Sequence, residues 1–176
     1  LGHGQMGRAV AGALARQGYP VQAWRRGAGG PSAAAAPGVE VLSGEVALAP
    51  ARARARVVIN LLPLTADTRG LIDAAWLAAM APGAGLVNLA RGAHLVEADL
   101  LAALASGQIG HAVLDVFHTE PLPAGHAFWR HPQVTVLPHA AALTDARSAA
   151  AVVAHNIDAL AAGRQVLHRV ERGAGY

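Results

Sequence analysis

Short runs of hydrophobic residues alternate along the chain with longer stretches in which hydrophobic residues recur every three or four positions. The runs predict buried β-strands and the longer stretches predict amphipathic helices. The predicted strands are residues 21–24, 39–42, 57–62, 85–90, 111–115 and 134–137. The predicted helices are residues 5–18, 44–50, 73–80, 96–106 and 144–162. Strands that alternate with helices in this rhythm predict an α/β fold with a doubly wound parallel sheet.

A glycine motif stands directly before the first predicted helix. Gly2, Gly4 and Gly7 form the pattern G-x-G-x-x-G, whose glycines permit a tight turn, a close approach to a pyrophosphate and close helix packing. Since the helix N-terminus would then meet the phosphates, Gln5 and Met6 are candidate cofactor-binding residues as well. The motif predicts a Rossmann-like dinucleotide-binding site. An ordinary glycine-rich turn is the alternative, because the chain contains 20 glycines.

The residues at the end of the predicted strand 21–24 favour NADP(H) as the cofactor. An NAD-binding site carries Asp or Glu near this point, where it binds the ribose hydroxyls. This chain has Trp24, Arg25 and Arg26 instead. Arginines suit a 2′-phosphate through charge-assisted contacts, so we favour NADP(H) over NAD(H). A solvated surface pair of arginines is the alternative interpretation.

Three polar residues follow three of the predicted strands. Arg91 follows strand 85–90, Glu120 comes shortly after strand 111–115, and His139 follows the strand that ends at Leu137. Ligands of open parallel sheets bind beyond the carboxyl ends of the strands.

These residue types suit the reduction of a 2-keto acid by hydride transfer. An arginine can hold the substrate carboxylate, a histidine can donate a proton to the developing alkoxide, and a carboxylate beside the histidine can hold its ring. Each of Arg91, Glu120 and His139 alone has a structural explanation, but together they predict an active site.

Composition narrows the function classes. Hydrophobic residues make up 53% of the chain and charged residues 14%, which favours a packed core over disorder. All 14 basic residues are arginines scattered among 11 acidic ones, without the concentrated basic face of a nucleic-acid-binding protein. We find neither a hydrophobic run of ~18 residues, as a membrane span needs, nor a signal-peptide pattern. We therefore expect a soluble, cytoplasmic protein that binds neither nucleic acid nor a membrane.

Cysteine and histidine usage bears on metal chemistry. The chain has no cysteine, which excludes disulfides, thiolate metal sites and cysteine nucleophiles. The histidines other than His139 lack a metal-ligand spacing such as H-E-x-x-H, so no metal is predicted. We expect surface or packing roles for these histidines, which are His3, His94, His111, His118, His126, His131, His155 and His168.

The motifs together resemble the D-isomer-specific 2-hydroxyacid dehydrogenase family, and the resemblance covers nearly all of the chain. The matching segments are G-H-G-Q-M-G at 2–7, N-L-L-P-L-T-A-D-T-R-G at 60–70, N-L-A-R-G at 88–92, G-H-A-V-L-D-V-F-H-T-E-P-L-P at 110–123, H-P-Q-V-T-V-L-P-H at 131–139, and the A-A-L-T that follows. The last three segments, which are 110–123, 131–139 and A-A-L-T, are highly specific in combination. The resemblance also implies a Rossmann-like fold.

The resemblance implies roles for the site residues. Arg91 would bind the substrate, Glu120 would be the acid partner, and His139 would be the proton donor. Ala90 and His139 would flank the nicotinamide, and Asp115 would lie near its carboxamide.

The adenosine side of the cofactor would be lined by Leu62, Pro63 and Thr65, again by resemblance. Within the family, the segments at 24–26, 57–63 and 170–176 are most similar to reductases of glyoxylate and hydroxypyruvate. The implied reactions are the NADPH-dependent reduction of glyoxylate to glycolate and of hydroxypyruvate to D-glycerate. Two alternatives stay open: a dehydrogenase of the family with another 2-hydroxyacid, and a non-catalytic, corepressor-like protein that senses a dinucleotide.

The chain departs from the family at its start. Family members carry a substrate domain of roughly 100 residues before the glycine motif. Here residues 1–142 correspond to the dinucleotide-binding domain without most of its first strand, and 143–176 to a helix and tail that would pack on the substrate domain. We therefore expect a piece of a longer, homodimeric protein, with an open slot between two strands and little turnover in isolation.

Overall fold

The computed structural model describes residues 1–27 and 35–170. The chain forms two compact units, Leu1–His139 and Ala140–Tyr176. The second unit contains α5 (Ala146–Ala161), and the predicted packing of this unit on a substrate domain stays a prediction. The motif at 170–176 lies outside the described residues except for Val170.

The helices and strands of the first unit follow one another in the order that the hydrophobic pattern predicts. They are α1 (Gln5–Arg16), β1 (Val21–Arg25), β2 (Val39–Ser43), α2 (Glu45–Arg54), β3 (Val57–Asn60), α3 (Ala74–Ala78), β4 (Ala84–Asn88), α4 (Glu97–Ala105), β5 (Ile109–Leu114) and β6 (Val134–Val136). Two short 3₁₀ helices, Gly92–His94 and Ala127–Arg130, lie in the loops after β4 and before β6.

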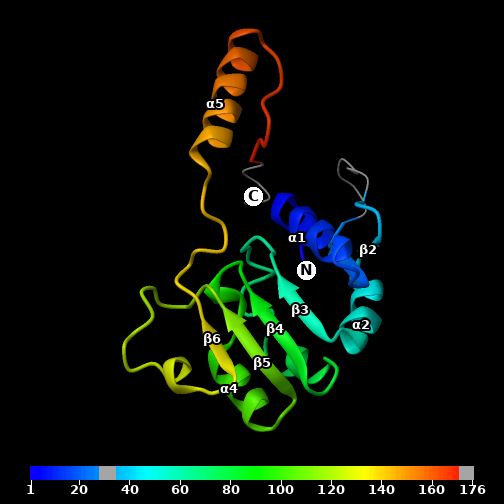
Figure 1. Ribbon diagram of the computed structural model, residues 1–176, viewed down its shortest axis with the longest axis vertical. Helices are drawn as coiled ribbons and strands as arrows, with labels where there is room; N and C mark the ends of the chain where they lie inside the picture. Colours follow the sequence, from blue (N-terminus) through cyan, green and yellow to red (C-terminus); the bar gives the residue numbers. More distant parts are fainter. Residues whose placement is uncertain (28–34, 171–176) are drawn as a thin grey trace. The chain divides into compact units, whose positions relative to one another are not determined.

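The strands are parallel throughout the first unit. Figure 1 shows β3, β4, β5 and β6 side by side in chain order, and they form one four-stranded sheet. β1 and β2 form a separate parallel pair. This arrangement confirms the predicted α/β class, and it puts the carboxyl ends of β3 to β6 at one edge of their sheet.

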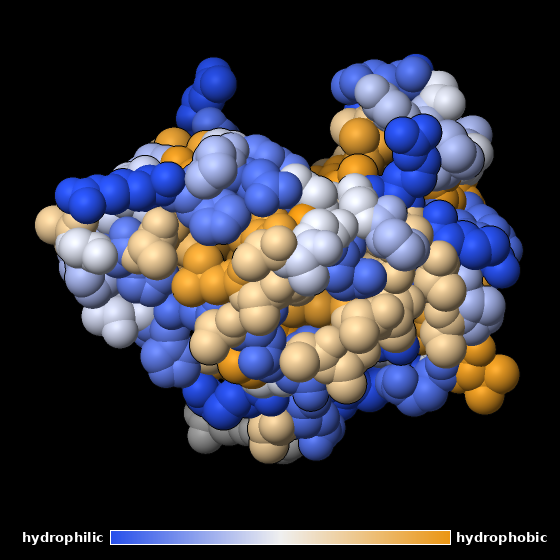
Figure 2. Space-filling model, turned by 90° about the horizontal axis from the view of Figure 1, so that it is seen from below, coloured by the Kyte–Doolittle hydropathy of each residue, from blue (hydrophilic) through white to orange (hydrophobic). Residues whose placement is uncertain are grey.

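Aliphatic side chains from the sheet and from α4 form the main core. Leu86, Leu100, Ile109 and Leu114 are fully buried, and burial of each such side chain stabilises the fold by about 1.5–3 kcal/mol. Hydrophobic residues also reach the surface. Figure 2 shows them gathered near the centre of the face seen from below, with hydrophilic residues around them.

The helix α2 is longer than predicted. Its sequence continues the helix through Pro50 to Arg54, although a proline inside a helix removes one backbone hydrogen bond. The alternating alanines and arginines that follow have high helix propensity, and Arg52 and Arg54 complement the helix dipole in the last turn. These local preferences offset the missing bond.

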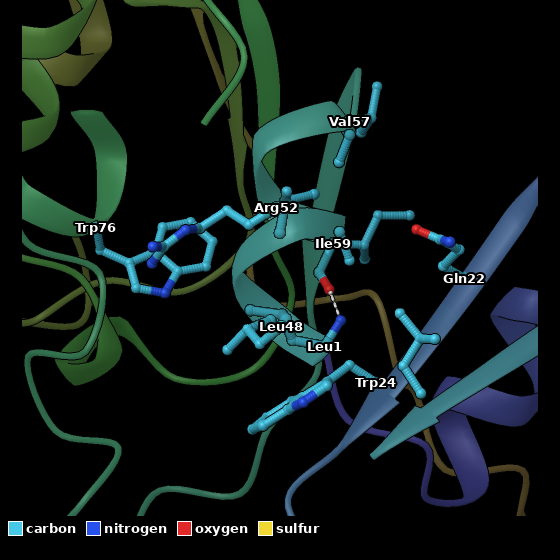
Figure 3. A pocket seen from close by; sticks show the side chains of 12 residues that line it. Leu1, Gln22, Trp24, Leu48, Arg52, Val57, Ile59 and Trp76 are labelled. Carbon is cyan, nitrogen blue, oxygen red and sulfur yellow. Dashed lines mark hydrogen bonds between the residues drawn. The ribbon is translucent and has the colours of Figure 1, made fainter. Parts of the chain in front are cut away.

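The predicted slot lies between β1 and β3. Only the first two residues occupy this position: the Leu1 amino group donates to the Ile59 carbonyl at 2.6 Å, and the Gly2 N–H donates to the Trp24 carbonyl at 2.9 Å. Beyond them the space is an open pocket, in which Gln22 lies on one side and Val57 on the other (Figure 3). β1 and β3 therefore belong to separate sheets.

The start of the chain is buried at this slot. Burial lowers the pKa of the Leu1 amino group from 8.0 to about 6, because the charged form is poorly solvated there. No helix in the described part of the chain is both long enough and apolar enough to cross a membrane.

We predict that a strand-forming extension before Leu1, such as Val-Ile-Val-Ile-Val, stabilises the chain. It would pair with β1 and β3, and a peptide N–H would replace the buried amino group at the Ile59 carbonyl. We expect the midpoint of thermal unfolding to rise by roughly 4 °C or more. Calorimetry would measure it against a Gly-Ser-Gly-Ser-Gly extension, and an equal effect of the two extensions would contradict the prediction.

Candidate active site

The glycine motif forms a tight backbone turn into α1. Gly2 has φ 87°, and a Cβ atom at Gly7 would overlap the Gly2 carbonyl oxygen, so both positions require glycine. Open space surrounds the position of a Cβ atom at Gly4, which precedes the exposed Gln5 and Met6 and provides no capping side chain. A phosphate can approach the start of the helix here, which fits a dinucleotide.

The three residues predicted to bind the ribose side of the cofactor differ in their surroundings. The Trp24 indole is buried and donates to the Gly44 carbonyl at 2.8 Å, so its side chain belongs to the core. Arg25 donates from Nε to the Ser43 hydroxyl at 3.2 Å. Arg26 forms an exposed ion pair with Asp67, at 2.7 Å between Nη1 and Oδ2. The sequence has no carboxylate next to these arginines, but the fold brings one from a distant loop.

The loop after β3 is held by Thr68. Its hydroxyl donates to the Pro63 carbonyl at 2.8 Å and accepts the Thr65 N–H at 2.8 Å. Leu62 is buried on the same loop, where it packs in a small cluster with Trp24. The predicted adenosine-side residues thus share one fixed turn.

Two further cofactor candidates lie where β4 and β5 end. Ala90 is buried, and its N–H donates to Asn88 Oδ1 at 3.3 Å. Asp115 is also buried, and its N–H donates to the Asn88 carbonyl at 3.0 Å. Asn88 therefore connects the two loops in which Ala90 and Asp115 lie.

The fold brings Glu120 and His139 together. His139 Nδ1 lies 2.7 Å from Glu120 Oε2, while Glu120 Oε1 accepts the Phe117 N–H at 2.9 Å. His139 has φ 54°, in the left-handed region that few residues other than glycine adopt. The carboxylate thus holds one ring nitrogen, and the other nitrogen remains available for proton transfer.

The charge state of Glu120 follows from its neighbours. Partial burial raises the pKa of Glu120, but the Phe117 N–H, the hydrogen bond to His139 and the positive charges of His139 and Arg91 outweigh it. The net pKa lies below its ordinary value of 4.5. Glu120 is therefore a carboxylate at neutral pH.

Arg91 reaches this site because two loops approach closely. A Cβ atom at Gly92 would overlap the Phe117 backbone, so only glycine allows the Arg91 turn to lie against the segment that leads to Glu120. The Arg91 side chain is exposed, and its Nη1 donates to the Ala90 carbonyl at 2.6 Å. Arg91, Glu120 and His139, each predicted at the end of a strand, thus belong to one region.

Several buried polar residues beside the site were not predicted from the sequence. Asn60 and Asn88, both fully buried, lie at the ends of β3 and β4 and share a hydrogen bond of 3.0 Å from Nδ2 to Oδ1. His94 is buried as well, with both ring nitrogens near carbonyl oxygens. The signal for the asparagines was present, because each is the one polar residue in a hydrophobic run. For His94 no such pattern exists.

Within residues 1–27 and 35–170, no group of three or more His, Asp or Glu side chains could hold a metal ion.

We predict that His139→Gln raises the pKa of Glu120 toward 4.5, because it removes a positive charge and weakens a hydrogen bond. A carboxyl group whose pKa is lowered by folding contributes stability above its unfolded pKa, and this contribution is lost as the pH falls through the folded pKa. The wild type should therefore lose more stability between pH 5 and 3 than the variant.

Carbon NMR of the glutamate carboxyls would measure this pKa directly. His111→Gln, on β5 and away from Glu120, is the matched control and should leave the Glu120 titration unchanged. A Glu120 pKa that is the same in His139→Gln and in the wild type would contradict the prediction.

Known proteins resemble this chain in sequence and in fold. Residues 1–141 match the model of the NAD-binding domain of D-isomer specific 2-hydroxyacid dehydrogenases. The whole chain is 46% identical over 176 residues to glyoxylate/hydroxypyruvate reductase A of Serratia proteamaculans (strain 568), and covers 55% of that protein.

Solved structures give the same result. A D-isomer specific 2-hydroxyacid dehydrogenase from Xanthobacter autotrophicus Py2, in complex with NADPH and MES, matches 99% of this chain over 70% of its own length, with TM-score 0.91 and 42% identity. The NADPH-dependent glyoxylate/hydroxypyruvate reductase of Sinorhizobium meliloti, in complex with NADP and sulfate, matches 99% of this chain over 55% of its own length, with TM-score 0.90 and 37% identity.

The chain spans about half the length of the curated relative that it matches. The family model covers most of the chain, and the solved relatives share its fold. The resemblance inferred from the motifs is thus confirmed: the chain belongs to the D-isomer specific 2-hydroxyacid dehydrogenase family.

Proposed function

We propose that the chain provides the cofactor site and the catalytic groups of an oxidoreductase that transfers a hydride from NADPH to a small 2-keto acid. The observation that carries the proposal is the 2.7 Å contact between His139 and Glu120, in the region that Arg91 also reaches. Glyoxylate and hydroxypyruvate are the proposed substrates, because relatives with 46% and 37% identity are reductases of these two compounds.

Each of the three groups has a chemical task. The Arg91 guanidinium binds the substrate carboxylate and draws electron density toward the keto oxygen, away from the carbonyl carbon. Bound NADPH supplies the hydride to the carbonyl carbon. His139 donates a proton to the carbonyl oxygen, which becomes the hydroxyl of the product. Glu120 holds the ring in place through Nδ1.

The cofactor assignment rests on the start of α1 and on the arginines after β1. The turn at Gly2, Gly4 and Gly7 would hold the pyrophosphate, and Arg25 and Arg26 would bind the 2′-phosphate. Two of the similar solved structures contain NADPH or NADP. Roles for Gln5, Met6, Leu62, Pro63, Thr65, Ala90 and Asp115 in cofactor binding remain part of this proposal, and Trp24 would contribute only its backbone. A homodimer in the cytoplasm is likewise proposed.

The test uses this chain and a chimera. Fluorescence titration would measure NADPH binding to the chain itself. In the chimera, the part of the Serratia relative that comes before its match to this chain is fused in front of Leu1. We expect the chain to bind NADPH, and the chimera to oxidise NADPH with glyoxylate or hydroxypyruvate.

We predict that His139→Gln lowers kcat of the chimera by about 10²–10⁴-fold, which is the usual contribution of a general acid. His111→Gln is the control and should retain the wild-type kcat. NADPH binding without turnover of either keto acid in the chimera would favour a dinucleotide-sensing protein. Turnover with another 2-keto acid alone would correct the substrate assignment.

The Arg26–Asp67 ion pair gives a prediction about cofactor preference. Asp67→Asn should tighten NADPH binding about 2–5-fold, because Asp67 competes with the 2′-phosphate for Arg26. Arg26→Ala should weaken NADPH binding by about tenfold. Neither change should alter the Kd of NADH, which lacks this phosphate. Equal effects on the two cofactors would contradict the prediction.

A further inference from the structure

A buried network of polar groups joins the loop after β3 to the loop that carries Arg91. Its side chains are Asn60, Asn88 and His94, all fully buried. The carbonyls of Pro63 and Arg91 also belong to it. We call this set the polar network. Since unpaired polar groups are costly in a protein interior, a network of this kind has one preferred arrangement.

The contacts follow one another from Asn60 to the Pro63 carbonyl. Asn60 Nδ2 donates to Asn88 Oδ1 at 3.0 Å, and Asn88 Nδ2 donates to the Arg91 carbonyl at 3.2 Å. His94 Nδ1 lies 3.1 Å from the same carbonyl, and its Nε2 lies 3.2 Å from the Pro63 carbonyl. His94 is thus the direct connection between the two loops.

The protonation state of the His94 ring follows from its surroundings. Burial lowers the pKa of His94, and the positive charges of Arg91 and Arg69 lower it as well, against the opposing effect of the two carbonyls. At neutral pH the ring is therefore neutral and carries one N–H.

The count of hydrogen-bond acceptors decides which ring nitrogen holds that proton. The Arg91 carbonyl already accepts from Asn88 Nδ2 and from the His94 backbone N–H, each at 3.2 Å, which uses both of its lone pairs. The Pro63 carbonyl accepts from the Thr68 hydroxyl at 2.8 Å and has one lone pair left. The His94 proton therefore belongs on Nε2, where it is donated to Pro63.

We propose that His94 is a positioning residue, which fixes the cofactor-binding turn at Pro63 relative to the Arg91 loop through a hydrogen bond from its Nε2–H. This inference rests on the proposed function, because it assigns the Pro63 turn to the cofactor. His94 itself touches neither reactant.

Two conservative variants of His94 test which of its two ring nitrogens is needed. The side-chain nitrogen of glutamine takes a position close to Nε2, whereas that of asparagine takes a position close to Nδ1. His94→Gln should therefore keep the bond to Pro63, and His94→Asn should lose it. Because asparagine is also one methylene group smaller than glutamine, the unfolding temperatures of the two variants show how much of any difference comes from packing.

The experiment measures the Kd of NADPH for the chain and for both variants, with the unfolding temperature as a check on folding. We expect His94→Gln to bind within about twofold of the wild type and His94→Asn to bind about tenfold more weakly. Nitrogen NMR of the wild-type ring, without any ligand, should show the proton on Nε2.

The outcomes are distinct. Equal Kd values for the two folded variants would overturn the role of His94, while NADPH binding to the wild type would leave the proposed function intact. Failure of the wild type itself to bind NADPH would overturn the proposed function and this inference with it. If neither variant folds, the NMR measurement decides, since a proton on Nδ1 would overturn the assignment.

Discussion

The hydrogen bond between Asn60 and Asn88 is the constraint on which the site depends. The two residues are paired in register at the ends of β3 and β4, and the loops that contain Pro63 and Arg91 leave the sheet directly after them. Each amide also binds backbone groups of its own loop: Asn60 accepts from the Leu62 N–H, and Asn88 accepts from the Ala90 N–H. One buried pair therefore sets where both loops begin.

The sequence predicted the fold well because the hydrophobic pattern reports burial, and parallel strands are buried on both faces. It also placed Arg91, Glu120 and His139 after strand ends, and parallel pairing brings such ends to one edge of the sheet. What it could not predict are contacts between loops. Asp67 lies 41 residues from Arg26 and in no recognisable spacing with it, and His94 has partners defined only by the folded positions of two carbonyls.

Trp24 shows that a position in the sequence does not by itself reveal whether a side chain lies at a site or in the core. Its place beside two arginines favoured a role near the cofactor, but an indole is large and apolar apart from one N–H, and the core offers both a cavity and an acceptor. The structure buries it with Leu48 and Leu62 and satisfies its N–H at the Gly44 carbonyl. Burial of a large aromatic group outweighs any weak surface contact that the same side chain could make.

The charged pairs of the site contribute little to stability, and their value is geometric. An exposed ion pair such as Arg26–Asp67 is worth about 0–1 kcal/mol, and the contact between His139 and Glu120 is partly exposed as well. The rigid parts are instead backbone contacts that exclude any side chain, at Gly7 against Gly2 and at Gly92 against Phe117. Because a backbone contact has no rotamers to lose, it holds the glycine turn and the Arg91 loop at fixed separations from their neighbours. The charged side chains attached to these loops then need little binding energy of their own to stay in position.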